Sequence, residues 1–190
     1  EFKVIFWWEW GHRQLGRLIG LTVLIPLMFF YIKNGLWILK KYGLIFLLVC
    51  FQGFIGWYMV SSGLIDRVDV SHYRLSLHLV TAFIILSVVF WNFLKLTKIQ
   101  THYASININL IKFFLFLLFL QLIIGAFVSG MDAGKIYNTW PLMGLSYFPD
   151  DSQFIDFLNV SVFDNPSIVQ FIHRNLAYLI FLVFLILSFK

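Results

Sequence analysis

Three histidines and one glutamate are the residues whose types and spacing could do chemistry in this chain. Each histidine stands near the start of a long apolar segment, with an arginine beside it or one turn before it. The histidines are His12, His78 and His173, and the glutamate is Glu9. Histidines at similar depth on three helices can converge inside a bundle, where facing helices build cofactor sites. We therefore expect these histidines to bind a cofactor.

The simpler alternative is that the three histidines are polar tips at the ends of membrane helices. For a single histidine, a polar helix end is a commoner explanation than a cofactor ligand. For all three, each with an arginine partner, the pattern favours function, because ionisable groups inside membrane segments are rare and mark functional sites. The other two histidines, His72 in a short connection and His102 on a lysine-rich side, are expected to be solvated.

Heme fits the three histidines better than zinc does. No cysteine or carboxylate clusters with any pair of them, whereas zinc sites gather several such ligands. Their neighbours are apolar and aromatic, which suits a flat hydrophobic cofactor whose iron takes axial imidazoles. Heme propionates need cationic partners, and guanidinium matches carboxylate geometry. All five arginines lie on the same side as the histidines: Arg13, Arg17, Arg67, Arg74 and Arg174.

Glu9 lies three residues before His12, on the same face if the helix already runs there. A carboxylate beside an axial ligand could take up or deliver protons during chemistry at the heme edge. The alternative is an ordinary acid favoured by the positive end of the helix dipole. The sequence leaves both interpretations open.

The composition predicts that membrane helices position these residues. Of 190 residues, 61% are hydrophobic and 12% are charged, against about 25% charged in a soluble domain. Five apolar stretches are long enough to cross a bilayer core of about 30 Å. They run at about 12–32, 43–64, 73–94, 110–131 and 168–188. The expected fold class is all-α, a polytopic transmembrane bundle of about five spanning helices.

The charges divide between the two ends of these segments. One side carries lysines and no acid: Lys33, Lys40, Lys41, Lys95, Lys98, Lys112 and Lys190. The other side carries every acid: Glu1, Glu9, Asp66, Asp69, Asp132, Asp150, Asp151, Asp156 and Asp164. Lysine and arginine in short loops mark the cytoplasm. We expect an inner-membrane protein with the N-terminus of this chain outside and its C-terminus cytoplasmic. The same rule explains the net charge of +5 without nucleic acid.

The longest connection, about 132–166, lies on the predicted outer side and is expected to fold over the mouth of the bundle. Long structured loops usually serve function. A weak internal repeat pairs His12-Arg13 with His173-Arg174, and Gln52…Gly56 with Gln121…Gly125. Membrane bundles often arise by duplication, so a fourth histidine is expected on a helix that would follow residue 190.

Several stretches, in order along the chain, resemble the heme A synthase family. Glu9-Trp10-x-His12-Arg13 with Gly16-Arg17 resembles the start of that family's second helix, and Ser71-x-Tyr73-Arg74-Leu75-x-x-His78 resembles its fourth. Gly125-Ala126-x-Val128-x-Gly130-x-x-Ala133-Gly134, followed by Asn138-Thr139-Trp140-Pro141-Leu142-Met143, resembles its fifth helix and the loop beyond. Phe171-x-His173-Arg174 resembles its sixth. The absence of an outer-loop cysteine pair is similar to the proteobacterial and mitochondrial type. His72 stands where the family pattern has proline.

The resemblance implies a fold of eight helices in two pseudo-symmetric four-helix halves, each with a histidine pair. Residues 1–108 would be most of the N-terminal half, which holds the substrate heme, and 109–190 the first part of the C-terminal half, which holds heme b. The first helix and the last two have no counterpart in this chain, which therefore resembles a fragment. Its start, Glu1-Phe2-Lys3, has no initiator methionine or signal-peptide pattern.

The resemblance also implies an oxidoreductase that makes heme A for cytochrome oxidase. Two successive hydroxylations would oxidise the C8 methyl group of heme O to a formyl group. His12 and His78 would ligate the iron of the substrate heme, and Glu9 would be the catalytic acid. His173 would ligate the iron of a second heme, a b-type cofactor that carries electrons away. The arginines expected to hold heme propionates are Arg13, Arg17, Arg74 and Arg174.

Two other functions compete with this interpretation. A non-catalytic membrane cytochrome b would also need histidine pairs, but usually at both membrane depths, whereas these three histidines lie on one side. A transporter or assembly factor without cofactor would give a colourless protein. The expected partners are heme O, heme A, membrane lipid, the farnesyltransferase that supplies heme O (heme O synthase) and a second copy of the chain. No nucleic acid is expected among them.

Overall fold

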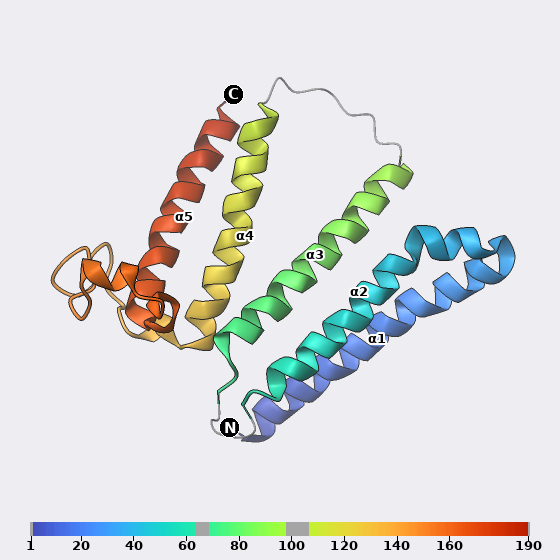
Figure 1. Ribbon diagram of the computed structural model, residues 1–190, viewed down its shortest axis with the longest axis horizontal. Helices are drawn as coiled ribbons and strands as arrows, with labels where there is room; N and C mark the ends of the chain where they lie inside the picture. The colour runs from blue at the N-terminus through green and yellow to red at the C-terminus, as the bar shows by residue number, and fades with distance from the viewer. Residues whose placement is uncertain (1, 64–68, 98–106, 190) are drawn as a thin grey trace. The chain divides into compact units, whose positions relative to one another are not determined.

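Five long helices and three short 3-10 helices account for most of the described chain. The computed structural model describes residues 2–63, 69–97 and 107–189. The long helices are α1 (Phe2–Asn34), α2 (Leu36–Val60), α3 (His72–Thr97), α4 (Ile108–Gly130) and α5 (Pro166–Ser188), shown in Figure 1. The short ones are η1 (Ala133–Lys135), η2 (Phe154–Leu158) and η3 (Val162–Asp164). Within the described ranges there is no strand. The expectations for Glu1, Asp66, Arg67, Lys98, His102 and Lys190 lie outside the described residues.

All five long helices are long and apolar enough to cross a membrane. Most of their large apolar side chains are exposed on the isolated chain, for example Trp57, Leu86 and Phe181. Lipid and neighbouring helices, rather than water, are the surroundings that such surfaces suit. The predicted fold class, an all-α polytopic bundle in a membrane, is therefore confirmed.

The first two helices extend further than the apolar pattern predicted. Helix α1 begins at Phe2 rather than near residue 12, and α2 begins at Leu36 rather than near residue 43. Helical turns therefore contain Lys33, Lys40 and Lys41. The prediction that these lysines lie in a loop between the two helices is wrong. Lysine ends an apolar run without ending a helix, because it is a good helix former whose stem packs along neighbouring turns. The Lys33 Nζ lies 4.4 Å from the Phe29 ring centre, for example.

Gly35 alone separates α1 from α2. Its φ of +74° lies in the left-handed region that glycine adopts without strain. Its N–H donates to the Tyr31 carbonyl at 2.7 Å, which caps the end of α1. The chain therefore reverses within one residue, and α2 runs back antiparallel to α1 (Figure 1).

By its internal contacts the chain divides into two compact units. One contains Glu1–Trp57 and Thr81–Ile99, and the other contains Tyr58–Val80 and Gln100–Lys190. The first unit thus holds α1, most of α2 and the later part of α3. The second holds the start of α3, all of α4 and α5, and the connection between these two. The predicted division at residue 108 concerns the halves of a longer fold and stays a prediction.

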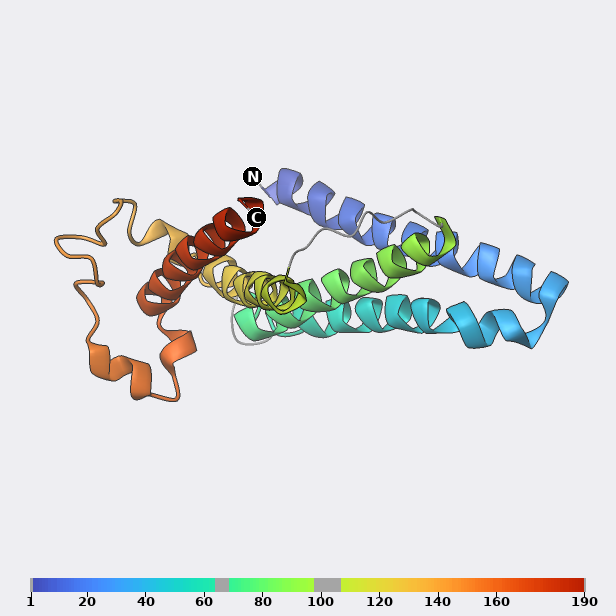
Figure 2. The ribbon, with the colours of Figure 1, turned by 90° about the horizontal axis from the view of Figure 1, so that it is seen from above.

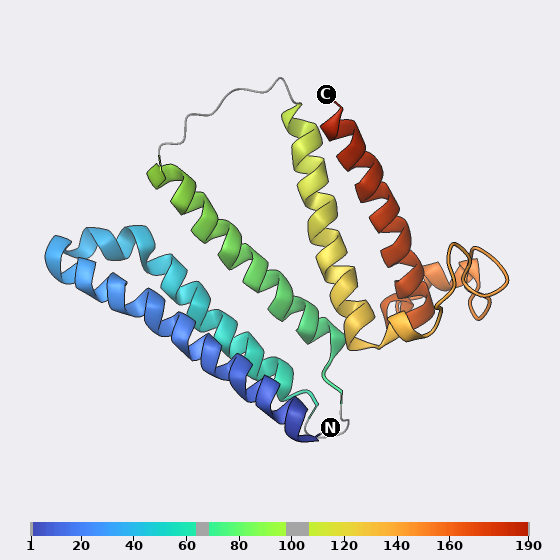
Figure 3. The ribbon, with the colours of Figure 1, turned by 180° about the vertical axis from the view of Figure 1, so that it is seen from behind.

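The second unit is built around the contact between α4 and α5, which lie side by side (Figure 3). Ile124 and Phe127 of α4 and Val169 of α5 form its buried apolar core. Helix α5 starts at a defined point, because the Asn165 side chain caps it by accepting from the N–H groups of Ser167 at 3.0 Å and Ile168 at 3.2 Å. Figure 2 shows the connection between α4 and α5 looping out beside the start of α5.

The start of α3 packs against the end of α4 through His72. The side chain of His72 is 11% exposed, and its Nε2 lies 3.2 Å from Asp164 Oδ1 of η3. Its ring meets the Phe127 ring edge-on at 5.2 Å. The expectation that His72 is solvated is therefore wrong. Gly130 makes this burial possible, because it presents no side chain where the histidine backbone crosses α4.

A side chain at position 130 should destabilise the second unit. The Cβ of Gly130→Ala would lie 2.9 Å from His72 Cβ and 3.0 Å from His72 Cα. Backbone atoms cannot rotate away, so we expect a loss of about 1–3 kcal/mol in unfolding free energy, measured by denaturant titration in detergent. Gly53→Ala is the matched control, because nothing lies within 4 Å of its Cβ. Equal stability of the two variants would contradict the close crossing.

Candidate functional site

His173 lies on the face of α5 that packs against α4. Gln121 Nε2 of α4 lies 3.2 Å from His173 Nε2 and 3.3 Å from the His173 carbonyl oxygen. One turn further along α4, a Cβ on Gly125 would lie 3.2 Å from His173 Cε1. The other ring nitrogen, Nδ1, is buried and has no hydrogen-bond partner among the described groups. The imidazole is therefore seated against α4, with one buried nitrogen unsatisfied.

Arg174, the next residue, fixes the connection between α4 and α5 to α5. Its Nη2 donates to the Tyr137 carbonyl at 2.6 Å, and its Nη1 donates to the Thr139 carbonyl at 2.8 Å. Gln170, one turn earlier, donates to the Tyr137 carbonyl at 2.9 Å and accepts from the Tyr137 N–H at 3.3 Å. Both ends of the guanidinium fork are thus engaged with backbone. The propionate role expected for Arg174 stays a prediction.

The same connection is held at two further points along α5. Trp140 Nε1 donates to Tyr178 Oη at 2.7 Å, and Tyr147 Oη donates to Asn175 Oδ1. Within the connection, Met143 is almost fully buried and the Phe148 and Phe154 rings stack at 4.4 Å. The connection is therefore a structured segment with a small core of its own.

Asp151 links this segment to the first turn of α5. Its Oδ2 accepts from Ser167 Oγ at 2.7 Å. Burial raises the pKa of the Asp151 carboxyl, but the hydroxyls of Ser167, Tyr137 and Ser152 outweigh it and hold that pKa below its usual value. Burial and the Asp151 carboxylate raise the pKa of the Tyr137 phenol. At neutral pH Asp151 is therefore ionised and Tyr137 is neutral.

Arg74 joins the start of α3 to the end of α2, one turn before His78. Its Nη1 donates to the Tyr58 carbonyl at 2.8 Å, and its guanidinium lies 3.8 Å from the Tyr58 ring centre. Ser71 N–H donates to Ser62 Oγ at 2.9 Å across the same connection. His78 itself is half-buried. Arg74 Nη1 also lies 3.5 Å from Ser61 Oγ.

In the first unit, Glu9 and His12 lie in continuous α-helix. The two positions are three residues apart and therefore share a face, as expected. Glu9 Oε2 lies 3.3 Å from Arg13 Nη2, with both side chains more than half exposed. Arg17 donates to Gln14 Oε1 at 3.0 Å, and His12 is exposed within this unit. Since His12 and His78 belong to different units, their meeting at one heme stays a prediction.

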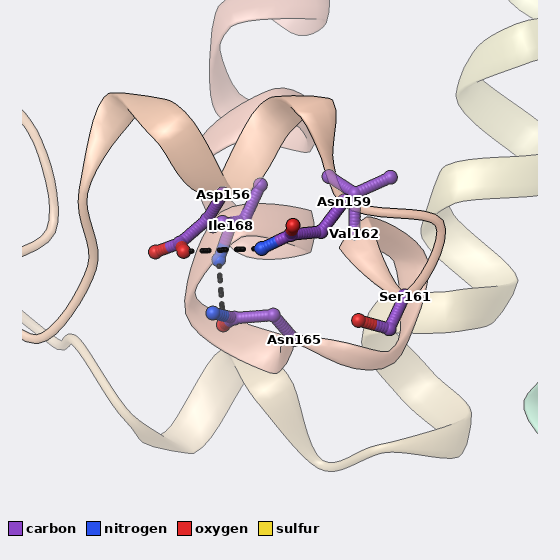
Figure 4. Close-up of a pocket in the computed structure, with 6 residues that line it drawn as sticks. All are labelled: Asp156, Asn159, Ser161, Val162, Asn165 and Ile168. Carbon is purple, nitrogen blue, oxygen red and sulfur yellow. Dashed lines mark hydrogen bonds between the residues drawn. The ribbon is translucent and has the colours of Figure 1, made fainter.

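A small pocket of about 170 Å³ lies within the α4–α5 connection and contains none of the predicted site residues (Figure 4). Asp156 in its wall accepts from Asn159 at 3.4 Å, and Asn165 accepts from the Ile168 N–H at 3.2 Å. Asp156, Asn159 and Asn165 are thus hydrogen-bonded within the pocket wall. Among the described residues no group of three histidines, cysteines or acids is placed to hold a bare metal ion.

Sequence reasoning missed the residues that surround His173 and Arg174. Gln121 and Gly125 stood out only as part of a repeat, although a glutamine inside an apolar segment indicates a partner on another helix. Gln170 and Tyr137 gave no signal, because their bonds join a side chain to the backbone of a distant segment.

The whole chain, residues 1–190, matches the COX15-CtaA family, described as cytochrome oxidase assembly protein. It is 52% identical to the heme A synthase of Pelagibacter ubique over 191 residues, which cover 100% of this chain and 57% of that protein. It is 46% identical to the heme A synthase of Maricaulis maris, covering 95% of this chain and 54% of the relative. It is 42% identical to the heme A synthase of Flavobacterium johnsoniae, covering 100% of this chain and 58% of that relative. The chain spans a little over half the length of these relatives, and no solved structure matches it.

Replacing Arg174 with lysine should release the α4–α5 connection. A lysine is a point donor that cannot reach the Tyr137 and Thr139 carbonyls at once. Losing one charge-assisted hydrogen bond, worth about 1.5–3 kcal/mol, should speed proteolytic cleavage within 145–160 about tenfold or more in detergent. Arg17→Lys is the control, because the described partner of Arg17, Gln14, is on its own helix. Cleavage at the parent rate would show that Arg174 does not hold the segment.

Proposed function

This chain belongs to the COX15-CtaA family of cytochrome oxidase assembly proteins, and on that premise we propose that it acts in the synthesis of heme A from heme O. The observation that carries the proposal is 52% identity to a heme A synthase over the full length of this chain. The non-catalytic cytochrome b considered as the alternative is not favoured by these relatives.

One feature of the described residues supports a heme ligand at His173. Its Nδ1 is buried without a hydrogen-bond partner, which is a costly state for an imidazole that has no further ligand. Gly125 lets the ring edge lie close against α4, because a Cβ there would lie 3.2 Å from His173 Cε1. We propose that His173 ligates the iron of a b-type heme, which when bound carries electrons away from the substrate.

His12 and His78 are proposed to bind the iron of the substrate, heme O. Arg13, Arg17 and Arg74 would pair with its propionates, with Arg174 serving the second heme. Of these, Arg74 is pre-positioned by its contact with the Tyr58 ring. The farnesyl tail of heme O partitions into lipid, so the substrate can enter sideways between helices.

Glu9 is proposed to hold and move protons at the reacting methyl group. Each hydroxylation is a two-electron oxidation that replaces a C–H bond with a C–O bond; with water as the oxygen source it releases two protons, and two electrons that would pass to the second heme. The geminal diol left after two hydroxylations loses water to give the formyl group. A nearby carboxylate can accept the protons released by the hydroxylations. Glu9 lies one turn before His12 and is exposed rather than locked in the core, so it is placed to exchange protons. Contacts with heme O synthase and with a second copy of the protein complete the proposal.

Heme A formation tests the assignment directly. The protein carrying this chain would be expressed in a host that makes heme O but no heme A, and extracted hemes separated by chromatography. We expect His12→Ala to abolish heme A and Glu9→Gln to lower it about a hundredfold, the scale of general acid–base catalysis. Asp132→Asn is the matched control, an exposed carboxylate paired with a neighbouring base. An undiminished amount of heme A in both His12→Ala and Glu9→Gln would contradict the proposed function.

The proposed orientation has its own test. With Cys50 replaced by serine, single cysteines would be placed at the exposed positions Val160 and Asn34. A membrane-impermeant maleimide should label Val160→Cys in intact cells with a permeable outer envelope, and Asn34→Cys only after lysis, because lysine-rich ends stay cytoplasmic. The reverse labelling pattern would show that the orientation in the membrane is opposite to the proposed one.

A further inference from the structure

The connection between α4 and α5 lies beside the first turns of α5 rather than beyond the end of that helix (Figures 1 and 3). Arg174 donates to the Thr139 carbonyl at 2.8 Å. Further along the helix, Tyr178 Oη accepts from Trp140 Nε1 at 2.7 Å. At 1.5 Å per residue, Arg174 and Tyr178 stand about 12 Å and about 18 Å from Pro166, where α5 begins. Helical side chains lean toward the start of their helix, and even so the connection reaches past the second turn of α5.

This height along α5 falls within the thickness of a membrane. Helix α5 has 23 residues and is about 34 Å long, which is little more than the apolar core of a bilayer, about 30 Å thick. Only about one turn of α5 can therefore protrude from the core. A part of the chain that lies level with the second turn of α5 is at bilayer depth.

The part of the connection that lies along α5 carries no charge. Residues 136–149, called here the uncharged segment, contain no Asp, Glu, Lys, Arg or His. The remainder, residues 150–165, contains four aspartates: Asp150, Asp151, Asp156 and Asp164. Charged side chains are costly inside a bilayer, so the uncharged segment suits bilayer depth and the acidic remainder suits water.

The backbone of the uncharged segment is hydrogen-bonded within the protein, as irregular backbone at bilayer depth must be. Protein groups bind its backbone at six positions: Tyr137, Thr139, Leu142, Met143, Gly144 and Leu145. The Thr139 hydroxyl serves two of them, because it donates to the Leu142 carbonyl at 2.9 Å and accepts from the Gly144 N–H at 3.3 Å. The segment can therefore leave water without losing these hydrogen bonds.

The uncharged segment lies on the side of α5 that faces away from α4 (Figure 1). Val169 and His173 face α4, whereas Arg174, which binds the segment, is about 140° around the helix axis from Val169. The apolar side chains of the segment are not used up in these contacts, since Trp140 is 74% exposed and Leu145 is 92% exposed. Exposed apolar surface at bilayer depth suits lipid acyl chains rather than water.

We propose that the uncharged segment, residues 136–149, is a re-entrant segment that lies in the leaflet where α5 begins, with Trp140 and Leu145 against lipid acyl chains. The acidic remainder of the connection lies in the aqueous phase. Gln170 and Arg174 are polar residues within an apolar span, and they satisfy the backbone of the segment where water cannot. This placement depends neither on the proposed function nor on the side of the membrane at which α5 begins.

The accessibility of a nitroxide label tests this placement. The protein carrying this chain, with its native cysteines replaced by serine, would be labelled at Leu145→Cys and reconstituted in phosphatidylcholine vesicles. Electron paramagnetic resonance would compare collisions with O₂, which concentrates among acyl chains, and with a water-soluble nickel chelate. We expect the ratio of O₂ to nickel accessibility to be several-fold higher than at Val160→Cys, a fully exposed position in the acidic remainder. Phe181→Cys, exposed within the span of α5, is the control for a label in lipid.

A second labelled position guards against a local disturbance by the first. Leu142→Cys lies in the same segment and is 42% exposed, so its label should show the same preference for O₂ as the label at Leu145. Ratios at both positions equal to the ratio at Val160 would place the segment in water and overturn the proposal. Low accessibility of both labels to both reagents would show that protein rather than lipid covers the segment, which would overturn it as well.

Discussion

Polar groups inside apolar helices have no water to bind, and this constraint organises the second unit. A partner on a neighbouring helix or segment stabilises such groups. Gln121 of α4 binds His173 of α5, and the buried Ser76 of α3 lies 3.5 Å from the Ile123 carbonyl of α4. Arg174 satisfies three groups at once, its own guanidinium and two loop carbonyls. The contacts between these helices therefore occur where their few polar side chains lie close to a polar group of the neighbouring helix.

Two consecutive residues of α5 face different neighbours. His173 lies against α4, while Arg174 binds the connection that precedes α5. Successive helical residues are about 100° apart around the axis. One short stretch of α5 therefore contacts both α4 and the connection that precedes α5. The position of the imidazole and the position of the segment beside it are thereby set by the same helical turn. The His173-Arg174 pair therefore indicates two contacts of α5, where either residue alone would indicate one.

The sequence predicted the helices and the family well, and the local partners poorly. Apolar length alone located five spans, because the bilayer imposes that length, but it placed the starts of α1 and α2 too late, since lysine at positions 33, 40 and 41 is compatible with helix. The burial of His72 could not be predicted, because it depends on Gly130, far away in sequence. The roles of His12, His78 and His173 came from a resemblance that the relatives support at family level. Gln121 could be identified only once α4 and α5 were placed together.

The single-residue turn at Gly35 has a consequence for biogenesis. With one residue between them, α1 and α2 form a tight helical hairpin that can cross the bilayer as a unit. The turn carries Lys33, Lys40 and Lys41 close by. Moving a charge against a membrane potential costs about 2.3 kcal/mol per 100 mV, so three lysines together oppose translocation of the turn. In the proposed orientation, with this turn on the cytoplasmic side, the three lysines would hold the tip of the hairpin there.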